Sequence, residues 1–166
     1  MKKLEMLKNG MVDIIAIYQN FVNKIDDTIE IKQGEDYTAS LEDWDIEIPL
    51  IVSESNTDKF MLSVRDMSYS DDLVNSIDAS VWSFLHEVGH LQTKQGDLKS
   101  KIMRFVSHKC KSPLQDKIYY NIPEELNATE WAVNYVNLNW YEVKAFEQEL
   151  LKAYETLYNK VLAEAV

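Results

Sequence analysis

The sequence predicts a single α+β domain, residues 1–166, in which helices pack around a small antiparallel sheet of about three strands. Three observations predict this class. The 166 residues are the length of one domain, with no linker or internal repeat. Only 4 Gly and 3 Pro occur, which favours long helices. Apolar residues recur at steps of three and four near both ends, but at steps of two between residues 29 and 64.

Composition and charge exclude several classes of protein. The 28 acidic residues outnumber the 17 basic ones, and a net charge of −11 repels phosphates, which excludes a general nucleic-acid binder. No apolar run reaches the ~18–20 residues that span a bilayer, so we expect no membrane partner. Polar residues follow Met1-Lys2-Lys3 where a secretory signal would have its apolar centre. The single cysteine, Cys110, cannot form an internal disulfide, so we expect a cytoplasmic protein.

The first element is an amphipathic helix that covers the core. Its apolar side chains follow helical spacing, and charged residues separate them. They are Leu4, Leu7, Met11, Ile14, Ile15, Tyr18, Phe21, Val22 and Ile25.

Three short strands follow. Residues 29–31, 44–52 and 60–64 alternate between apolar and polar side chains, most clearly in the second segment. Because their connections are short, we expect an antiparallel meander. Pro49 cannot donate a hydrogen bond to a neighbouring strand, so the 44–52 strand is expected at an edge of the sheet or at a bulge.

Two contrasting segments come next. Residues 77–88 carry a helical apolar face, with Asn75 or Ser76 as the expected N-cap. Residues 93–117 hold seven of the 17 basic residues against two acidic ones. We expect this basic segment to be a solvated, partly mobile connection; the alternative is a docking site for an acidic partner or nucleic acid.

Two helices complete the chain. One begins near Pro123, a residue that suits the first turn of a helix. The other begins near Trp140, and we expect its apolar stripe to pack on the core of a monomer, with a homodimer as the alternative. The stripe comprises Val143, Phe146, Leu150, Leu157 and Val161.

The chemistry of the chain is concentrated in His86-Glu87-Val88-Gly89-His90. Positions four apart share one face of a helix, so both imidazoles can reach one ion, and zinc accepts such nitrogens. Glu87 lies beside the first histidine and can reach a water on that ion without binding the ion itself. The alternative is an ordinary solvated helix face. Gly89 costs about 1 kcal/mol against Ala inside a helix, which indicates a closely packed neighbouring element; the alternative is a tolerated surface glycine.

A catalytic zinc site needs a third protein ligand, and Glu125 is the best candidate. Glu125, Ala128 and Ala132 share one helix stripe, where small alanines let two helices approach while the carboxylate crosses to the histidines. The alternative for Glu125, and the simpler reading for Glu124, is an acidic first turn that complements the helix dipole. Glu130 and His108 remain as rival ligands.

The order of these motifs resembles the ImmA/IrrE group of zincin-like metallopeptidases, which occur in bacteria, phages and mobile elements. A helix, three strands and a His-Glu-x-x-His helix precede a helix with Glu-x-x-Ala-x-x-Trp-Ala. The matching residues are His86, Glu87, His90, Glu125, Ala128, Trp131 and Ala132. Two positions depart from the group's pattern. Thr129 stands where Asp or Asn is frequent, and residues 133–136 replace the usual Met-Pro ending.

The resemblance implies that His86, His90 and Glu125 bind zinc and that Glu87 is the general base of a zinc-dependent peptidase. Its substrate would be a protein or peptide, and a regulatory protein is one such partner. The residues that would stabilise the transition state stay open among His108, Tyr119, Tyr120 and Tyr135. The strand at 44–52 could pair with an extended substrate. Two other functions stay open: a zinc-bound regulatory module with little hydrolysis, and a metal-free structural protein.

Overall fold

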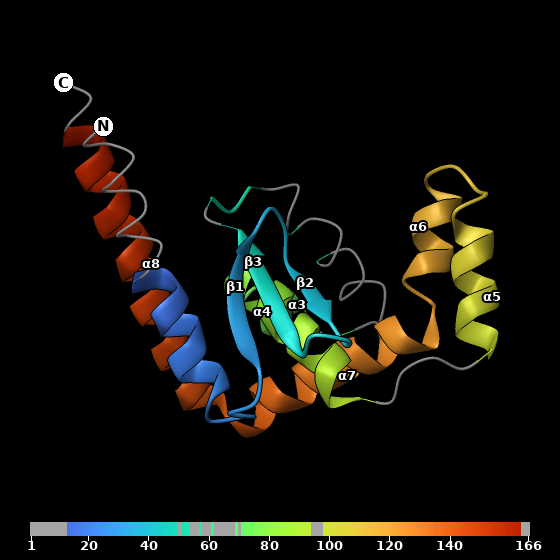
Figure 1. Ribbon diagram of the computed structural model, residues 1–166, viewed down its shortest axis with the longest axis horizontal. Coiled ribbons are helices and arrows are strands. Elements are labelled where there is room, and N and C mark those ends of the chain that lie inside the picture. Colours follow the sequence, from blue (N-terminus) through green and yellow to red (C-terminus); the bar gives the residue numbers. More distant parts are fainter. Residues whose placement is uncertain are drawn as a thin grey trace.

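A computed structural model describes residues 13–49, 51–53, 57, 61, 69, 71–93 and 98–163 of the chain (Figure 1). The fold is mixed α+β and mostly helical, as the sequence predicts. A small sheet occupies the centre, with helix α8 and the helical segment 13–22 on one side of it and helices α5 and α6 on the other.

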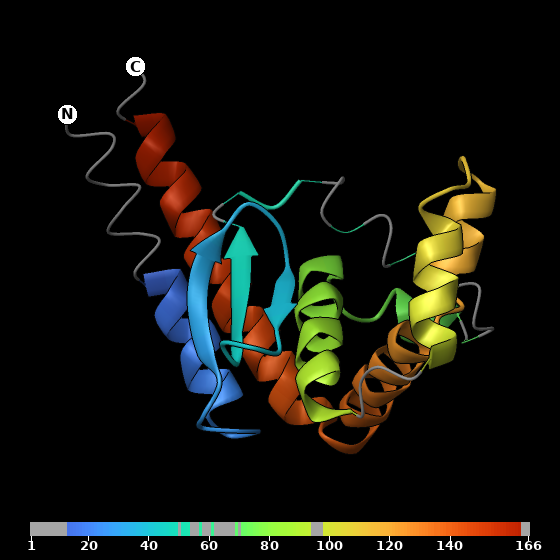
Figure 2. The same cartoon turned by 45° about the vertical axis from the view of Figure 1, so that its right-hand side comes forward.

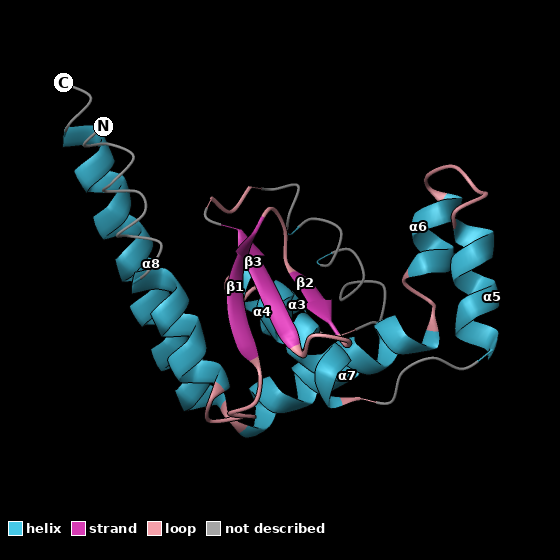
Figure 3. Cartoon of the chain, viewed as in Figure 1, coloured by secondary structure: helices cyan, strands magenta, loops and turns pink. Residues whose placement is uncertain are grey.

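The sheet contains β1 (Glu30–Gly34), β2 (Thr38–Ser40) and β3 (Asp45–Pro49) in the order β1-β3-β2 (Figure 3). β3 pairs in parallel with β1 and antiparallel with β2, so the predicted antiparallel meander is wrong and the sheet is mixed. The alternation of apolar and polar residues determines the register of this pairing. In that register Ile31 lies opposite Ile46, and both side chains are buried.

Two predictions about the strands need correction. β3 is central, although Pro49 predicted an edge or a bulge; the proline is tolerated because it is the last residue of the strand. Trp44 does not begin this strand but lies in the preceding turn with a left-handed φ of 56°. The strand predicted at 60–64 falls outside the described residues except for Met61, which is helical.

The central helix α4 (Ala79–Gln92) follows the short helix α3 (Asp71–Val74). Its N-cap is Asp78, not Asn75 or Ser76. The Asp78 carboxylate accepts a hydrogen bond from the backbone N–H of Ser80 at 2.9 Å, which satisfies one of the free donors of the first turn.

The basic segment is folded where it is described, contrary to the expected mobile connection. It forms α5 (Leu98–Ser107) and α6 (Leu114–Tyr119), which pack on each other as a hairpin. The next helix, α7 (Pro123–Leu138), has its proline in the first turn, as predicted. The last helix is α8 (Trp140–Ala163).

The core lies where α4, α8 and the helical segment 13–22 meet. Tyr18, Phe21, Phe84 and Phe146 bring their rings together there; the Phe21 and Phe146 rings are stacked at 4.1 Å. The predicted stripe of α8 is buried in this core at Val143, Phe146, Leu150 and Leu157, which confirms that it packs on its own chain; the side chain of Val161 lies outside the description. In the described part of the chain, no helix combines the length and apolar character that crossing a membrane requires.

Candidate metal centre

The site lies between α4 and α7, which pack against each other in an extensive contact (Figure 2). A Cβ atom added to Gly89 would lie 2.4 Å from the carbonyl oxygen of Ala128 and 2.9 Å from its Cα. No side chain fits in that space, so glycine is required where the helix backbones meet. This contact confirms the close approach that the sequence predicts for Gly89 and Ala128.

Three predicted ligand atoms converge where the two helices meet. The Nε2 atoms of His86 and His90 lie 3.1 Å apart, and each is 3.3 Å from Oε2 of Glu125. His86 and Glu125 are buried, while His90 is partly accessible. The histidines come from successive turns of α4, and the glutamate comes from the first turn of α7.

These distances meet the requirement of a tetrahedral metal ion. With bonds of about 2.0–2.1 Å to nitrogen and oxygen, two ligand atoms of a tetrahedron are about 3.3–3.4 Å apart. The three atoms are 3.1–3.3 Å apart, so a single point lies at bonding distance from all of them. Two imidazole nitrogens and one carboxylate oxygen therefore fit zinc by geometry and by ligand type, with a fourth position left for another ligand.

Thr129 orients the first histidine. Its hydroxyl donates to the carbonyl oxygen of Glu125 at 2.8 Å and lies 3.2 Å from Nδ1 of His86. Because the hydroxyl has one proton and gives it to the carbonyl, it can only accept from Nδ1–H. When the His86 ring is neutral, as a metal ligand must be, its proton is thereby held on Nδ1, which leaves the lone pair of Nε2 directed at the metal position. Threonine thus occupies a position that can orient the ring, as Asp or Asn can.

Glu87 is close to the histidines but is held by a different element. One of its carboxylate oxygens and one ring nitrogen from each of His86 and His90 lie within 4.8 Å of one another. Oε2 of Glu87 accepts a hydrogen bond from the backbone N–H of Ala39 in β2 at 2.9 Å. The strand therefore fixes this carboxylate beside the metal position while Glu125 supplies the converging oxygen.

Arg104 is a site residue that the sequence did not predict. From α5 it donates to Glu124 Oε2 at 2.8 Å and to Glu125 Oε1 at 3.2 Å, and it lies 5.6 Å from the ring centre of Tyr119. Glu124 is therefore buried in an ion pair and is not a solvated first-turn residue. One feature of the sequence could have indicated this role: Arg104 is the one arginine among the lysines of the basic segment, and a planar guanidinium can bridge two carboxylates.

The charges of the site shift its pKa values in both directions. Burial raises the pKa of Glu125, but the hydrogen bonds from His86 and His90 outweigh it and hold that pKa far below its usual range. Burial lowers the pKa of His90, whereas Glu125 and Glu87 raise it, and the net change is upward. For Glu87, burial raises the pKa, and the neighbouring histidines offset only part of the rise.

The other predicted candidates differ in their distance from this centre. Tyr119 is beside it, where burial and the charge of Glu125 raise the pKa of its hydroxyl to about 12. Tyr120 packs edge-on against Tyr119. Tyr135 stacks on Trp131 on another part of α7.

Neither rival ligand takes part in the convergence of atoms that the structure describes. His108 is exposed just beyond the end of α5, and Glu130 is exposed on α7. Comparison with protein-family models, with curated proteins and with solved structures found no match for this chain.

Proposed function

We propose that this chain is a zinc-dependent peptidase with a zincin-like fold, in which His86, His90 and Glu125 hold the ion. The observation that carries the proposal is the convergence of two imidazole nitrogens and one carboxylate oxygen at mutual distances of 3.1–3.3 Å. A second carboxylate, Glu87, is fixed beside that point by Ala39. This arrangement supplies the ligands, the open position and the base that metal-assisted hydrolysis requires.

The protein groups have separate roles in this reaction. When bound, zinc supplies acidity to a water molecule and polarises the scissile carbonyl. Glu87 accepts the proton of the attacking water and delivers it to the nitrogen of the departing amine. Thr129 keeps His86 in the tautomer that can bind metal, and Arg104 holds Oε1 of Glu125 so that Oε2 faces the histidines.

The substrate would approach along β2. The sequence predicts that the strand at 44–52 pairs with the substrate. This strand is β3, which is already paired on both sides, with β1 and with β2. β2 has only β3 as a neighbour in the described sheet and holds Glu87 through Ala39. An extended peptide that added to this edge would lie beside the metal position.

Replacing Glu87 by Gln tests the proposal. The change keeps the size of the side chain and removes the base, so one zinc per chain should still bind while hydrolysis falls by about 10²–10⁴-fold. Zinc is measured by plasma mass spectrometry, and hydrolysis is measured with fluorescein-labelled casein and with a mixed peptide library read by mass spectrometry. Glu130→Gln, an exposed change on α7, is the matched control and should behave like the unaltered protein.

Two results would contradict the peptidase. If zinc does not bind, the remaining interpretation is a structural protein without metal. If zinc binds and a cleavage activity is the same with Glu87→Gln, that activity does not arise at this site. A zinc-loaded protein that cleaves neither casein nor the peptide library favours the regulatory module instead.

A further inference from the structure

The outer face of α5 carries an apolar stripe that nothing in the described chain covers. Leu98, Ile102 and Phe105 are 74%, 54% and 65% exposed, and they follow one another at steps of four and three along one side of the helix. Ser100 and Ser107, by contrast, are buried on the opposite side. A surface helix ordinarily points its apolar side inward, whereas the apolar side of α5 faces outward.

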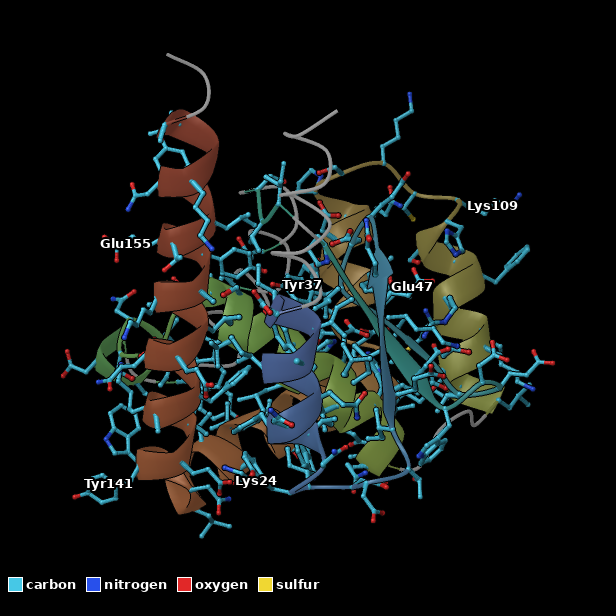
Figure 4. The ribbon with its side chains drawn as sticks, turned by 60° about the vertical axis from the view of Figure 1, so that its left-hand side comes forward. Lys24, Tyr37, Glu47, Lys109, Tyr141 and Glu155 are labelled. Carbon is cyan, nitrogen blue, oxygen red and sulfur yellow. The ribbon has the colours of Figure 1, made fainter. Side chains whose placement is uncertain are left out.

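Positive charge borders this stripe. At about 100° per residue, Lys99 and Lys101 flank the apolar side chains on either side of the helix. Nζ of Lys109 lies 5.5 Å from the ring centre of Phe105. Residues 98–119 hold six basic residues and one acidic residue, a net charge of +5 in a chain whose total is −11. Figure 4 shows Lys109 at the outer end of the hairpin, away from the sheet.

The same helix reaches the candidate metal centre from its inner side. Arg104 extends from α5 to Glu124 and Glu125, so the apolar stripe and the site are two sides of one helix. Figure 2 shows the hairpin beside the first turns of α7. A molecule bound to the outer face would therefore be separated from the metal position by the width of one helix, about 10 Å.

We propose that the outer face of α5, defined by Leu98, Ile102, Phe105, Lys99, Lys101 and Lys109, binds an acidic protein segment with apolar anchors and so recruits the substrate of the site. That this segment is a substrate rests on the proposed peptidase function, whereas its binding to α5 does not require hydrolysis. The apolar stripe would supply most of the affinity, and the lysines would select negative charge.

Size and charge favour a protein segment over two other occupants. The stripe extends about 11 Å along the helix from Leu98 to Phe105, which suits a short segment better than the ~800 Å² per partner of a stable dimer. The exposed apolar residues of α8, which a second copy would offer, lie on a helix with four acidic and three basic residues and so provide little negative charge. An anionic membrane would repel the acidic remainder of the chain.

The experiment uses three fluorescein-labelled synthetic peptides of about 18 residues, long enough to match the stripe. The first has leucines at helical spacing and Glu at the other positions, the second has Lys in place of Glu, and the third has Ser in place of leucine. Fluorescence anisotropy with the full chain should show binding of the first peptide, with affinity that falls as salt rises, and about tenfold or weaker binding of the other two.

Two pairs of substitutions locate the binding surface. Ile102→Ser with Phe105→Ser, and Lys101→Glu with Lys109→Glu, should each weaken binding of the first peptide by about tenfold or more. Leu151→Ser with Tyr158→Ser removes exposed apolar side chains from α8 and is the matched control, which should leave binding unchanged. Circular dichroism should show that all three variants fold like the unaltered protein, because every replaced side chain is exposed.

Several outcomes would overturn the proposal. Equal binding of the Lys and Glu peptides would exclude selection by charge, and equal binding by the α5 variants would exclude this surface. Phosphatidylglycerol vesicles that bind in place of the peptides would indicate a membrane surface. A dimer in sedimentation that Phe105→Ser abolishes would indicate a second copy.

If the Glu peptide binds equally well to Glu87→Gln and no hydrolysis is ever found, only the peptidase function fails.

Discussion

At the scale of single residues, the two carboxylate oxygens of Glu125 have different partners. Oε2 faces the histidines, while Oε1 accepts from Arg104. We therefore expect Glu125→Ala to abolish stoichiometric zinc binding, because a zinc site that retains only two protein ligands is incomplete. Glu130→Ala on the same helix is the control, and isothermal titration with zinc measures both. Unchanged zinc stoichiometry in Glu125→Ala would exclude this glutamate as a ligand.

Thr129 offers a second residue-scale test, because its hydroxyl is the acceptor for Nδ1–H of His86. Thr129→Val keeps the shape and removes the acceptor, so zinc affinity should fall by about 10–100-fold while the protein stays folded. Thr129→Ser retains the hydroxyl and should recover most of the affinity. A valine variant that binds zinc as tightly as the unaltered chain would show that the hydroxyl does not orient the ring.

The residues that converge at the candidate metal centre were predictable from the sequence, but the residues that hold them in place were not. Spacing of one helical turn identifies His86 and His90, and a shared helix stripe identifies Glu125, because both depend on local geometry. Arg104 and Ala39 act across 21 and 48 positions of sequence, respectively. Such contacts depend on how the elements pack, which local patterns do not specify.

At the scale of elements, the contact between α4 and α7 determines whether the ligands meet. Gly89→Ala would gain about 1 kcal/mol of helix propensity but place a methyl group 2.4 Å from the Ala128 carbonyl oxygen. Backbone atoms cannot rotate away, and overpacking costs about 1–3 kcal/mol, so the helices separate and the free energy of unfolding falls by up to about 2 kcal/mol.

Chemical denaturation with and without zinc measures this effect. Zinc should stabilise Gly89→Ala less than it stabilises the unaltered chain, because the ligands from the two helices are further apart. Asn134→Ala, an exposed change on α7, is the control. A Gly89→Ala protein as stable as the unaltered chain, and equally stabilised by zinc, would contradict the close approach of the helices.

The helices were predicted more accurately than the sheet. Pro123 and the apolar stripe of α8 mark their helices by local signals, and both are confirmed. β2 has three residues, Thr38–Ser40, which is too short for alternation to be recognised. α5 was missed because its basic residues indicated a solvated connection, although Leu98, Ile102 and Phe105 recur at helical steps of four and three.

At the scale of the whole molecule, three tyrosines from distant parts of the chain meet inside it. The hydroxyls of Tyr18 and Tyr37 lie 3.1 Å apart. Burial raises the pKa of Tyr18 well above its usual value, and the nearby Tyr37 and Tyr154 raise it further. Burial also raises the pKa of Tyr154 to about 12. These tyrosines join the helical segment 13–22, the loop before β2, and α8 in one buried group.

Alkaline pH should therefore weaken the fold. Below pH 10 the tyrosines are protonated in both states, whereas between about pH 10 and 12 the unfolded chain loses their protons first, so stability falls as pH rises. The expected slope is about 1.4 kcal/mol per pH unit for each tyrosine that stays protonated in the folded state. Tyr154→Phe should reduce the slope, and Tyr141→Phe, which is 88% exposed, should not.

Denaturant unfolding at several pH values, with absorbance at 295 nm to follow tyrosine ionisation, measures this dependence. If all nine tyrosines ionise together near pH 10 while the chain stays folded, the buried tyrosine group is not formed.

The central position of β3 has a consequence for how the chain reaches this structure. β1 and β2 come earlier in the sequence, but they do not pair with each other, and each has β3 as its partner. Until residues 45–49 arrive, neither earlier strand has a place in the sheet. Ala39, and with it the anchor of Glu87, is therefore positioned only when the last strand is inserted. We infer that the sheet and the anchor of Glu87 form in one cooperative step of folding.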